Sequence, residues 1–144
     1  MRLTVNGDEV EVAADRDTPL IYALRNDLQL KATRFGCGEG MCGSCLVLLD
    51  GHPTPSCDTP LWAAEGKQVT TVEGLRTHPV IGALLEEQAA QCGYCLSGIV
   101  ISAVALLNRT PQPDDADVRA ALEPNLCRCG VHNRVVRAVL RAGT

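Results

Sequence analysis

Residues 35–45, FGCGEGMCGSC, place three cysteines and four glycines in eleven positions. Glycine reaches backbone conformations that other residues avoid, so such a loop can wrap closely around a bound group. The whole chain has eight cysteines in 144 residues. An even number of cysteines is compatible with disulfide bonds or with metal sites. What the cysteines hold therefore decides which kind of fold this chain adopts.

The start of the chain favours metal binding over disulfide bonds. The first residues, MRLTVNGDEVEV, show strand-like alternation at once and lack the basic, apolar and small-residue regions of a secretory signal peptide. A cytoplasmic chain is the expectation, and cytoplasmic thiols are usually reduced, metal-bound or catalytic. We therefore interpret the cysteines as ligands.

Composition excludes two classes of partner. The net charge is -4 and only 3% of residues are aromatic, whereas nucleic-acid binding needs a basic groove and stacking rings. The longest apolar stretch, residues 96–108, is too short to span a bilayer and contains serine and glycine. It predicts a helix buried on nearly all sides.

The first cysteine set has the pattern C-x4-C-x2-C-x11-C and consists of Cys37, Cys42, Cys45 and Cys57. C-x4-C-x2-C followed by a distant cysteine is the spacing of plant-type [2Fe-2S] ferredoxins. Cluster-bound thiolates are anionic and need nearby N–H donors, which a closely wrapped glycine-rich backbone can supply. Zinc ligands usually come as two close pairs, which this loop lacks. The pattern predicts an iron-sulfur cluster.

The second cysteine set consists of Cys92 and Cys95 and, after 31 intervening residues, Cys127 and Cys129. Two close pairs suit tetrahedral zinc, although C-x-C is tighter than the usual zinc pair. Both pairs are expected at helix starts, where free N–H groups and the helix dipole favour an anion. From the residues alone, an iron-sulfur cluster is favoured and zinc stays open.

Residues 1–76 are predicted to form a small mixed α/β domain. Asn6 and Gly7 between alternating residues indicate a β-hairpin. A short helix is expected over 17–28, with Thr18 as its cap and Pro19 at its first position. Further strands are expected over 45–53, ending in an Asp50-Gly51 turn, and over 67–74.

Residues 77–144 are predicted to be helical. Apolar residues at helical spacing indicate four helices. We expect them over 79–91, 96–108, about 116–122 and 133–142. Four helices in so short a segment favour a compact bundle.

The combination of GCGEGMCGSC, QCGYC and NLCRC in one chain resembles the small iron-sulfur subunit of the xanthine oxidase family of molybdenum hydroxylases. The resemblance extends over nearly the whole chain. It implies an α+β fold, with an N-terminal β-grasp ferredoxin domain followed by a C-terminal four-helix-bundle domain, each with its own [2Fe-2S] cluster. Under this resemblance all eight cysteines are metal ligands, the second cluster being held by Cys92, Cys95, Cys127 and Cys129.

The resemblance also implies a division of labour with partner chains. A large subunit holds molybdopterin, expected as the cytosine dinucleotide, and Gln91 and Cys129 are expected to border its pterin. The present chain supplies no catalytic residue. It passes electrons from the molybdenum site through the helical-domain cluster and then the ferredoxin-domain cluster to an external acceptor, expected to be a flavin subunit or a cytochrome c domain.

The residues after the last cysteine suggest a branch of the family. Gly130, Val131 and His132 stand where many members have Thr-Gly-Tyr, and this run resembles the nicotinate dehydrogenase and isoquinoline 1-oxidoreductase small subunits. An N-heteroaromatic substrate such as nicotinate or isoquinoline is therefore expected. The alternatives are an aldehyde- or purine-oxidising member of the family, a free-standing two-cluster ferredoxin, or a zinc-stabilised interaction module.

Several other residues are expected to have structural roles. The histidines are expected in turns or at the surface, with His132 kept open as a residue that tunes the second cluster or lines a subunit interface. Phe35 and Trp62 are expected to be packing residues. A row of arginines is expected on a solvated or partner-facing side of the last helix. The row consists of Arg128, Arg134, Arg137 and Arg141.

Overall fold

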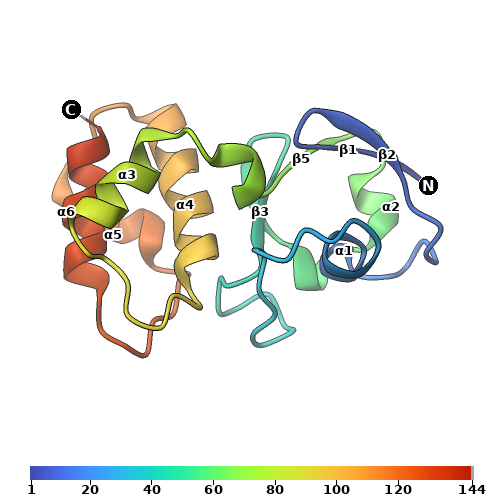
Figure 1. Cartoon of the computed structure of the whole chain (residues 1–144), viewed down its shortest axis with the longest axis horizontal. Helices are drawn as coiled ribbons and strands as arrows, with labels where there is room; N and C mark the ends of the chain where they lie inside the picture. The colour runs from blue at the N-terminus through green and yellow to red at the C-terminus, as the bar shows by residue number, and fades with distance from the viewer. Residues whose placement is uncertain (144) are drawn as a thin grey trace.

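A computed structural model describes residues 1–143 of the chain as a five-stranded mixed sheet beside a group of helices (Figure 1). The strand order is β2-β1-β5-β3-β4. The strands are β1 (Arg2–Val5), β2 (Asp8–Glu11), β3 (Leu46–Leu49), β4 (His52–Pro55) and β5 (Gln68–Thr70). β1 and β5 run parallel, and the other neighbours are antiparallel. This is the α+β arrangement with a ferredoxin-like β-grasp sheet that the sequence predicted.

The two hairpins follow the turn signals in the sequence. Asn6 and Gly7 connect β1 to β2 with φ of 53° and 89°, as a tight hairpin turn requires. Asp50 and Gly51 connect β3 to β4 with φ of 49° and 83°. One strand was expected over 45–53, and β4, which contains two prolines, was not expected as a separate strand. It lies at the sheet edge, where a missing N–H breaks no ladder bond.

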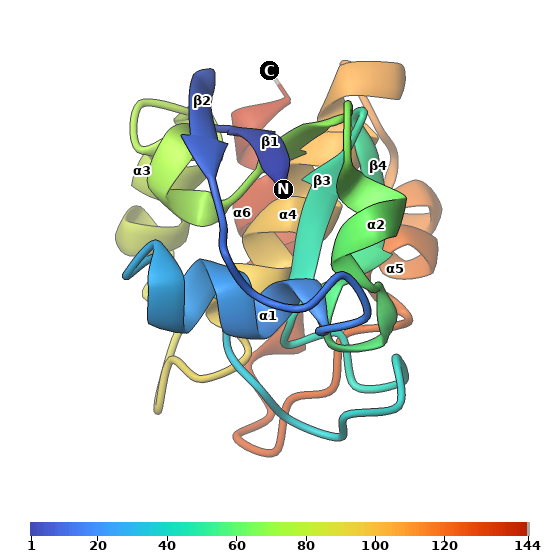
Figure 2. The ribbon, with the colours of Figure 1, turned by 90° about the vertical axis from the view of Figure 1, so that its right-hand side faces the viewer.

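β3 is buried on both faces. Val47 and Leu49 belong to an apolar core with the helical segments Leu20–Asp27 and Leu61–Ala64. Leu46 and Leu48 point the other way, into the core of the helical half. The sheet therefore lies between α1 (Leu20–Tyr22) and α2 (Leu61–Ala64) on one side and α4 (Leu96–Arg109) on the other, as Figures 1 and 2 show together.

The first helix differs from its prediction. α1 spans Leu20–Tyr22 and continues as a π-helical turn, Ala23–Asp27. Pro19 occupies the N-cap, and no side chain caps the helix, so the predicted capping by Thr18 is wrong. The start of the helix lies against the segment before Leu61–Ala64, where Leu20 N–H donates to the Thr59 carbonyl at 2.8 Å. Tertiary hydrogen bonding thus replaces a local cap.

Short helical turns follow β4 and β5 along the chain. They are η2 (Ser56–Asp58), α2 (Leu61–Ala64) and η3 (Val72–Leu75).

Four helices form the second half, as predicted. They are α3 (Pro79–Glu86), α4 (Leu96–Arg109), α5 (Asp115–Leu122) and α6 (His132–Ala142). α4 lies centrally, with nine residues buried over Gly98–Leu106. Within residues 1–143, no helix has both the length and the apolar character needed to cross a membrane.

α3 is shorter than the sequence pattern indicated. It ends at Glu86 rather than at residue 91, and Gln88 adopts a φ of 50°, which a helix cannot continue through. Residues 87–95 therefore form a loop that carries Gln91, Cys92 and Cys95.

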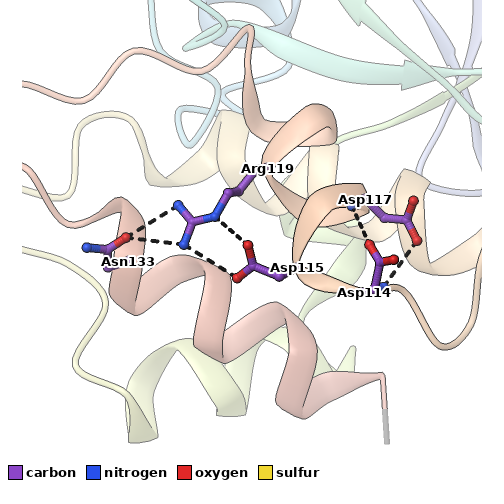
Figure 3. Close-up of polar contacts among 5 residues, drawn as sticks. All are labelled: Asp114, Asp115, Asp117, Arg119 and Asn133. Carbon is purple, nitrogen blue, oxygen red and sulfur yellow. Dashed lines mark hydrogen bonds and ion pairs between the residues drawn. The ribbon is translucent and has the colours of Figure 1, made fainter.

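Polar contacts define α5 and join it to α6 (Figure 3). Asp114 accepts from Asp117 N–H at 2.8 Å and donates its own N–H to the Asp117 carboxylate at 3.1 Å, which is a capping box. Arg119 binds Asp115 at 2.6 Å and reaches Asn133 of α6 at 3.4 Å. α5 is thus fixed at its start and against its neighbour.

Three arginines of the row make contacts that the sequence did not predict. Arg134 donates to the Gln88 carbonyl at 3.2 Å, and Arg137 and Arg141 pair with Glu87 at 3.2 and 3.1 Å. These three arginines hold α6 against the end of α3, where helix carbonyls carry partial negative charge. All three side chains are nevertheless exposed, as predicted for a solvated side of the helix.

His78 is a structural residue, as predicted for the histidines generally. Its Nδ1 accepts from Val80 N–H at 3.1 Å and caps α3, and burial lowers its pKa. Protonation would remove the acceptor.

We predict a pH dependence of stability from this cap. The pKa of His78 is lower in the folded than in the unfolded chain, so stability is full above about pH 6.5 and declines as pH falls below it. His78→Asn keeps an acceptor but does not titrate, so its urea midpoint should fall less between about pH 7.5 and 5 than that of the parent protein. Equal declines in both proteins would contradict the prediction. His78→Ala, the control without an acceptor, should be less stable than His78→Asn by about 1 kcal/mol.

Candidate metal centres

Three loops carry the cysteines, and they gather along one edge of the molecule (Figure 1). The first is the segment 36–45 before β3, with Cys57 close by in η2. The second is the segment 87–95 between α3 and α4, and the third is the segment 123–131 between α5 and α6.

The sulfurs of the first set lie in two neighbouring pairs. Cys37 and Cys42 are within hydrogen-bonding distance of each other, and so are Cys45 and Cys57. Cys37 also contributes to the raised pKa of Cys57, so the two pairs are near one another. Cys37 is exposed, whereas Cys45 and Cys57 are buried against Ile21.

Backbone donors surround the outer sulfur of this set. The N–H groups of Glu39, Met41 and Cys42 donate to Cys37 Sγ at 3.3, 3.3 and 3.4 Å. These donors lower the pKa of the Cys37 thiol to about 7. Burial raises the pKa of Cys57 to about 11, with Cys45 adding to the effect. The loop therefore favours an anionic sulfur at its rim, whereas a thiolate at the buried pair needs a cationic partner such as iron.

The second set has the same paired organisation. Cys92 lies beside Cys129, and Cys95 lies beside Cys127, so each pair joins the two loops. Burial raises the pKa of Cys95 to about 12. The pKa of Cys127 is lowered: desolvation opposes this, but backbone N–H groups from Val131, Cys129 and Gly130 outweigh it.

The pairing fits a two-iron cluster better than a single ion. A [2Fe-2S] cluster with four cysteines gives each iron two thiolates, so two facing pairs are the expected donor set. A tetrahedral zinc ion would bring all four sulfurs equally close. Each set fits a [2Fe-2S] cluster by donor type, pairing and N–H donors.

Direct contacts join the two sets. Leu126 N–H donates to the Cys42 carbonyl at 3.0 Å, which connects the loop before Cys127 to the first loop. The Tyr94 hydroxyl donates to the Phe35 carbonyl. A cavity of about 240 Å³ between the sets is lined by Cys42 of the first set and by Cys92, Cys95 and Cys127 of the second. The two candidate centres are therefore neighbours.

Gln91 borders the second set. It is exposed, lies beyond the end of α3 and lines a small cavity together with all four cysteines of that set. Among the described residues, no hydrogen bond holds its side chain. Its amide is thus available to a partner at this surface.

Other expected residues have mixed outcomes. Phe35 and Trp62 are 41% and 48% exposed, so the expectation of simple packing residues is wrong, although Phe35 stacks on Tyr22 at 6.1 Å. His132 lines a cavity with Leu122 and Glu123, on the α5 side of α6.

Sequence reasoning missed the residues that join the two sets. Leu126, Tyr94 and Asn125 lie beside motif cysteines but belong to no ligand pattern. Their adjacency to the cysteines was the available signal, and only the fold shows which loop each one reaches.

We predict that the pairing controls oxidation of the metal-free chain. Brief treatment with diamide should join neighbouring thiols, giving bridges between Cys37 and Cys42, Cys45 and Cys57, Cys92 and Cys129, and Cys95 and Cys127. Non-reducing peptide mapping would identify the bridges. Predominant bridges between a first-set and a second-set cysteine would contradict the grouping.

Comparisons with known proteins agree with two adjacent cluster domains. Residues 3–77 match the model of a 2Fe-2S iron-sulfur cluster binding domain, and residues 71–140 match the model of a [2Fe-2S] binding domain.

Two curated proteins are similar along almost their whole length. The chain is 52% identical to one of the subunits of nicotinate dehydrogenase from Pseudomonas putida, over 97% of this chain and 92% of that protein. It is 44% identical to the alpha chain of isoquinoline 1-oxidoreductase from Brevundimonas diminuta, over 96% and 93% respectively.

A solved structure has the same fold throughout. A chain of quinoline 2-oxidoreductase from Pseudomonas putida 86 aligns with a TM-score of 0.93 at 35% identity, covering 97% of this chain and 90% of that one. The two-domain arrangement is therefore shared with a related oxidoreductase.

Proposed function

Because the chain belongs to the small iron-sulfur subunits of the xanthine oxidase family of molybdenum hydroxylases, we propose that its eight cysteines hold two [2Fe-2S] clusters. As a member of this family it is an electron-transfer subunit, and its partner is a large subunit that carries molybdopterin. The observation that supports the ligand assignment is the arrangement of each cysteine set as two neighbouring pairs.

The proposed ligands divide by domain. Cys37, Cys42, Cys45 and Cys57 would hold one cluster in a ferredoxin domain, residues 1–76. Cys92, Cys95, Cys127 and Cys129 would hold the other in a helical domain, residues 77–144. When bound, each cluster takes up or releases one electron at a time. The protein's contribution is to hold the thiolates, donate N–H groups to them and limit water around the buried pairs.

We propose an order for the electron path. Gln91 and Cys129 would border the pterin, because Gln91 is exposed beside the second set and has a free amide. The second set would then receive electrons first. The first set would release them, because Cys37 lies in an exposed loop and Met41 beside it is 70% exposed.

The substrate class follows from the relatives. Two similar subunits belong to enzymes named for nicotinate and isoquinoline, so we propose an N-heteroaromatic substrate, with an aldehyde or a purine as the alternative. We also propose the cytosine dinucleotide form of molybdopterin and a flavin subunit or cytochrome c domain as acceptor. A cytoplasmic location is proposed because free thiols persist in a reducing compartment until clusters are inserted.

Replacing Gln91 tests the proposed pterin contact. Gln91→Ala removes no ligand, so iron and sulfide contents should be unchanged. A buried pterin group would lose its hydrogen-bond partner, at about 1–3 kcal/mol. We expect lower molybdenum retention or slower reduction of the clusters by substrate in the assembled enzyme.

The control for Gln91 is Gln68→Ala, which changes an exposed glutamine of β5. It should behave like the parent enzyme. Parent-like molybdenum content and reduction rate in Gln91→Ala would show that the residue does not contact the cofactor.

Cysteine variants test the proposed order. In the assembled enzyme with Cys57→Ser, substrate should still reduce the second-set cluster, and the paramagnetic signal of molybdenum should still be split by that cluster. Transfer to the external acceptor should be lost. In the matched variant Cys95→Ser the splitting should disappear. If instead Cys57→Ser abolished the splitting and Cys95→Ser retained it, the electron path would run in the opposite direction.

A further inference from the structure

A buried polar contact joins the two cysteine-bearing regions. Asn125 is 1% exposed, and its side chain accepts from Ser102 Oγ at 2.8 Å. The same side chain donates to the Gly43 carbonyl at 3.5 Å. Ser102 is itself 4% exposed. Both polar side chains are therefore removed from water and satisfied only by this arrangement.

Two glycines allow the backbones to meet at this point. A Cβ on Gly98 of α4 would lie 1.8 Å from the Gly43 carbonyl oxygen. A Cβ on Gly43 would lie 2.6 Å from the Pro124 carbonyl, and Gly43 has a φ of 78°. No other residue fits either position without moving the loops apart.

The contact lies between ligand segments of both sets. Gly43 stands between Cys42 and Cys45, Gly98 follows Cys95 by three residues, and Asn125 precedes Cys127 by two. The adjacent Leu126 N–H already binds the Cys42 carbonyl at 3.0 Å. Hence one buried joint brings together the segments 36–45 and 123–131 and the start of α4, which directly follows the segment that carries Cys92 and Cys95.

We propose that Asn125, held by Ser102, is a positioning residue that fixes the distance between the two clusters, with Gly43 and Gly98 permitting the close approach. We call Gly43, Gly98, Ser102 and Asn125 the inter-loop joint. The proposal rests on the proposed ligation of one cluster by each set. Electron transfer between centres falls steeply with distance, so a fixed short separation serves the one-electron relay.

The test compares two disruptive variants with two matched controls. Gly98→Ala places a methyl group against the Gly43 carbonyl, whereas Gly82→Ala makes the same change in α3, where nothing lies within 4 Å of the added atom. Ser102→Ala removes the hydroxyl that holds Asn125. Ser97→Ala removes a hydroxyl of the same helix that has no hydrogen-bond partner among the described residues.

The measurement is made on the full chain assembled with its large subunit, after both clusters are reduced with dithionite. Magnetic interaction between two reduced clusters splits their paramagnetic resonance and falls with the cube of their separation. Gly98→Ala and Ser102→Ala should weaken or remove this splitting while each cluster keeps its own signal and the iron content stays at the parent level. Gly82→Ala and Ser97→Ala should retain the parent splitting.

Parent-like splitting in both Gly98→Ala and Ser102→Ala, at full iron content, would overturn the proposed role of the joint. If the Gly98→Ala protein does not fold, the Ser102→Ala variant tests the proposal on its own, because this substitution removes only one oxygen atom. Failure of the proposed function would look different, because the parent protein itself would then lack iron and sulfide.

Discussion

Burial of both faces of β3 is the constraint on which the rest of the structure depends. Val47 and Leu49 pack into the core of the ferredoxin half, while Leu46 and Leu48 pack into the core that surrounds α4. Since apolar burial is the main stabilising term in folding, the two halves share one strand and cannot separate without exposing it. α4 is thereby fixed against the sheet, and the cysteine-bearing loops lie at the same edge (Figure 1).

That edge then has to hold two anionic groups in a protein of net charge -4. The chain does so with backbone dipoles. Three N–H groups donate to Cys37 Sγ, and the backbone N–H groups of Val131, Cys129 and Gly130 lower the pKa of Cys127. Fixed dipoles stabilise a thiolate without adding a mobile cation, and they leave the surface free for partner subunits. The arginines of α6 bind Glu87 and the Gln88 carbonyl at the end of α3 and do not stabilise the thiolates.

The sequence predicted the features that local patterns determine. Cysteine spacing separated the two sets, Asn6 and Gly7 marked a hairpin, and apolar periodicity located four helices. The features that the sequence did not predict depend on tertiary context. β4 is a strand despite its prolines because it lies at an edge, and α3 stops at Glu86 although the helical pattern continues. Asn125 is a single buried amide without a periodic signature, so only the fold reveals that it bridges two loops.

The central claim is that each cysteine set holds a two-iron cluster, and metal analysis of the purified chain tests it most directly. The account predicts a red-brown protein with about four iron and four acid-labile sulfide per chain and no stoichiometric zinc. A colourless protein containing zinc, or one with iron but about two sulfides per chain, would contradict the assignment of a cluster to both sets.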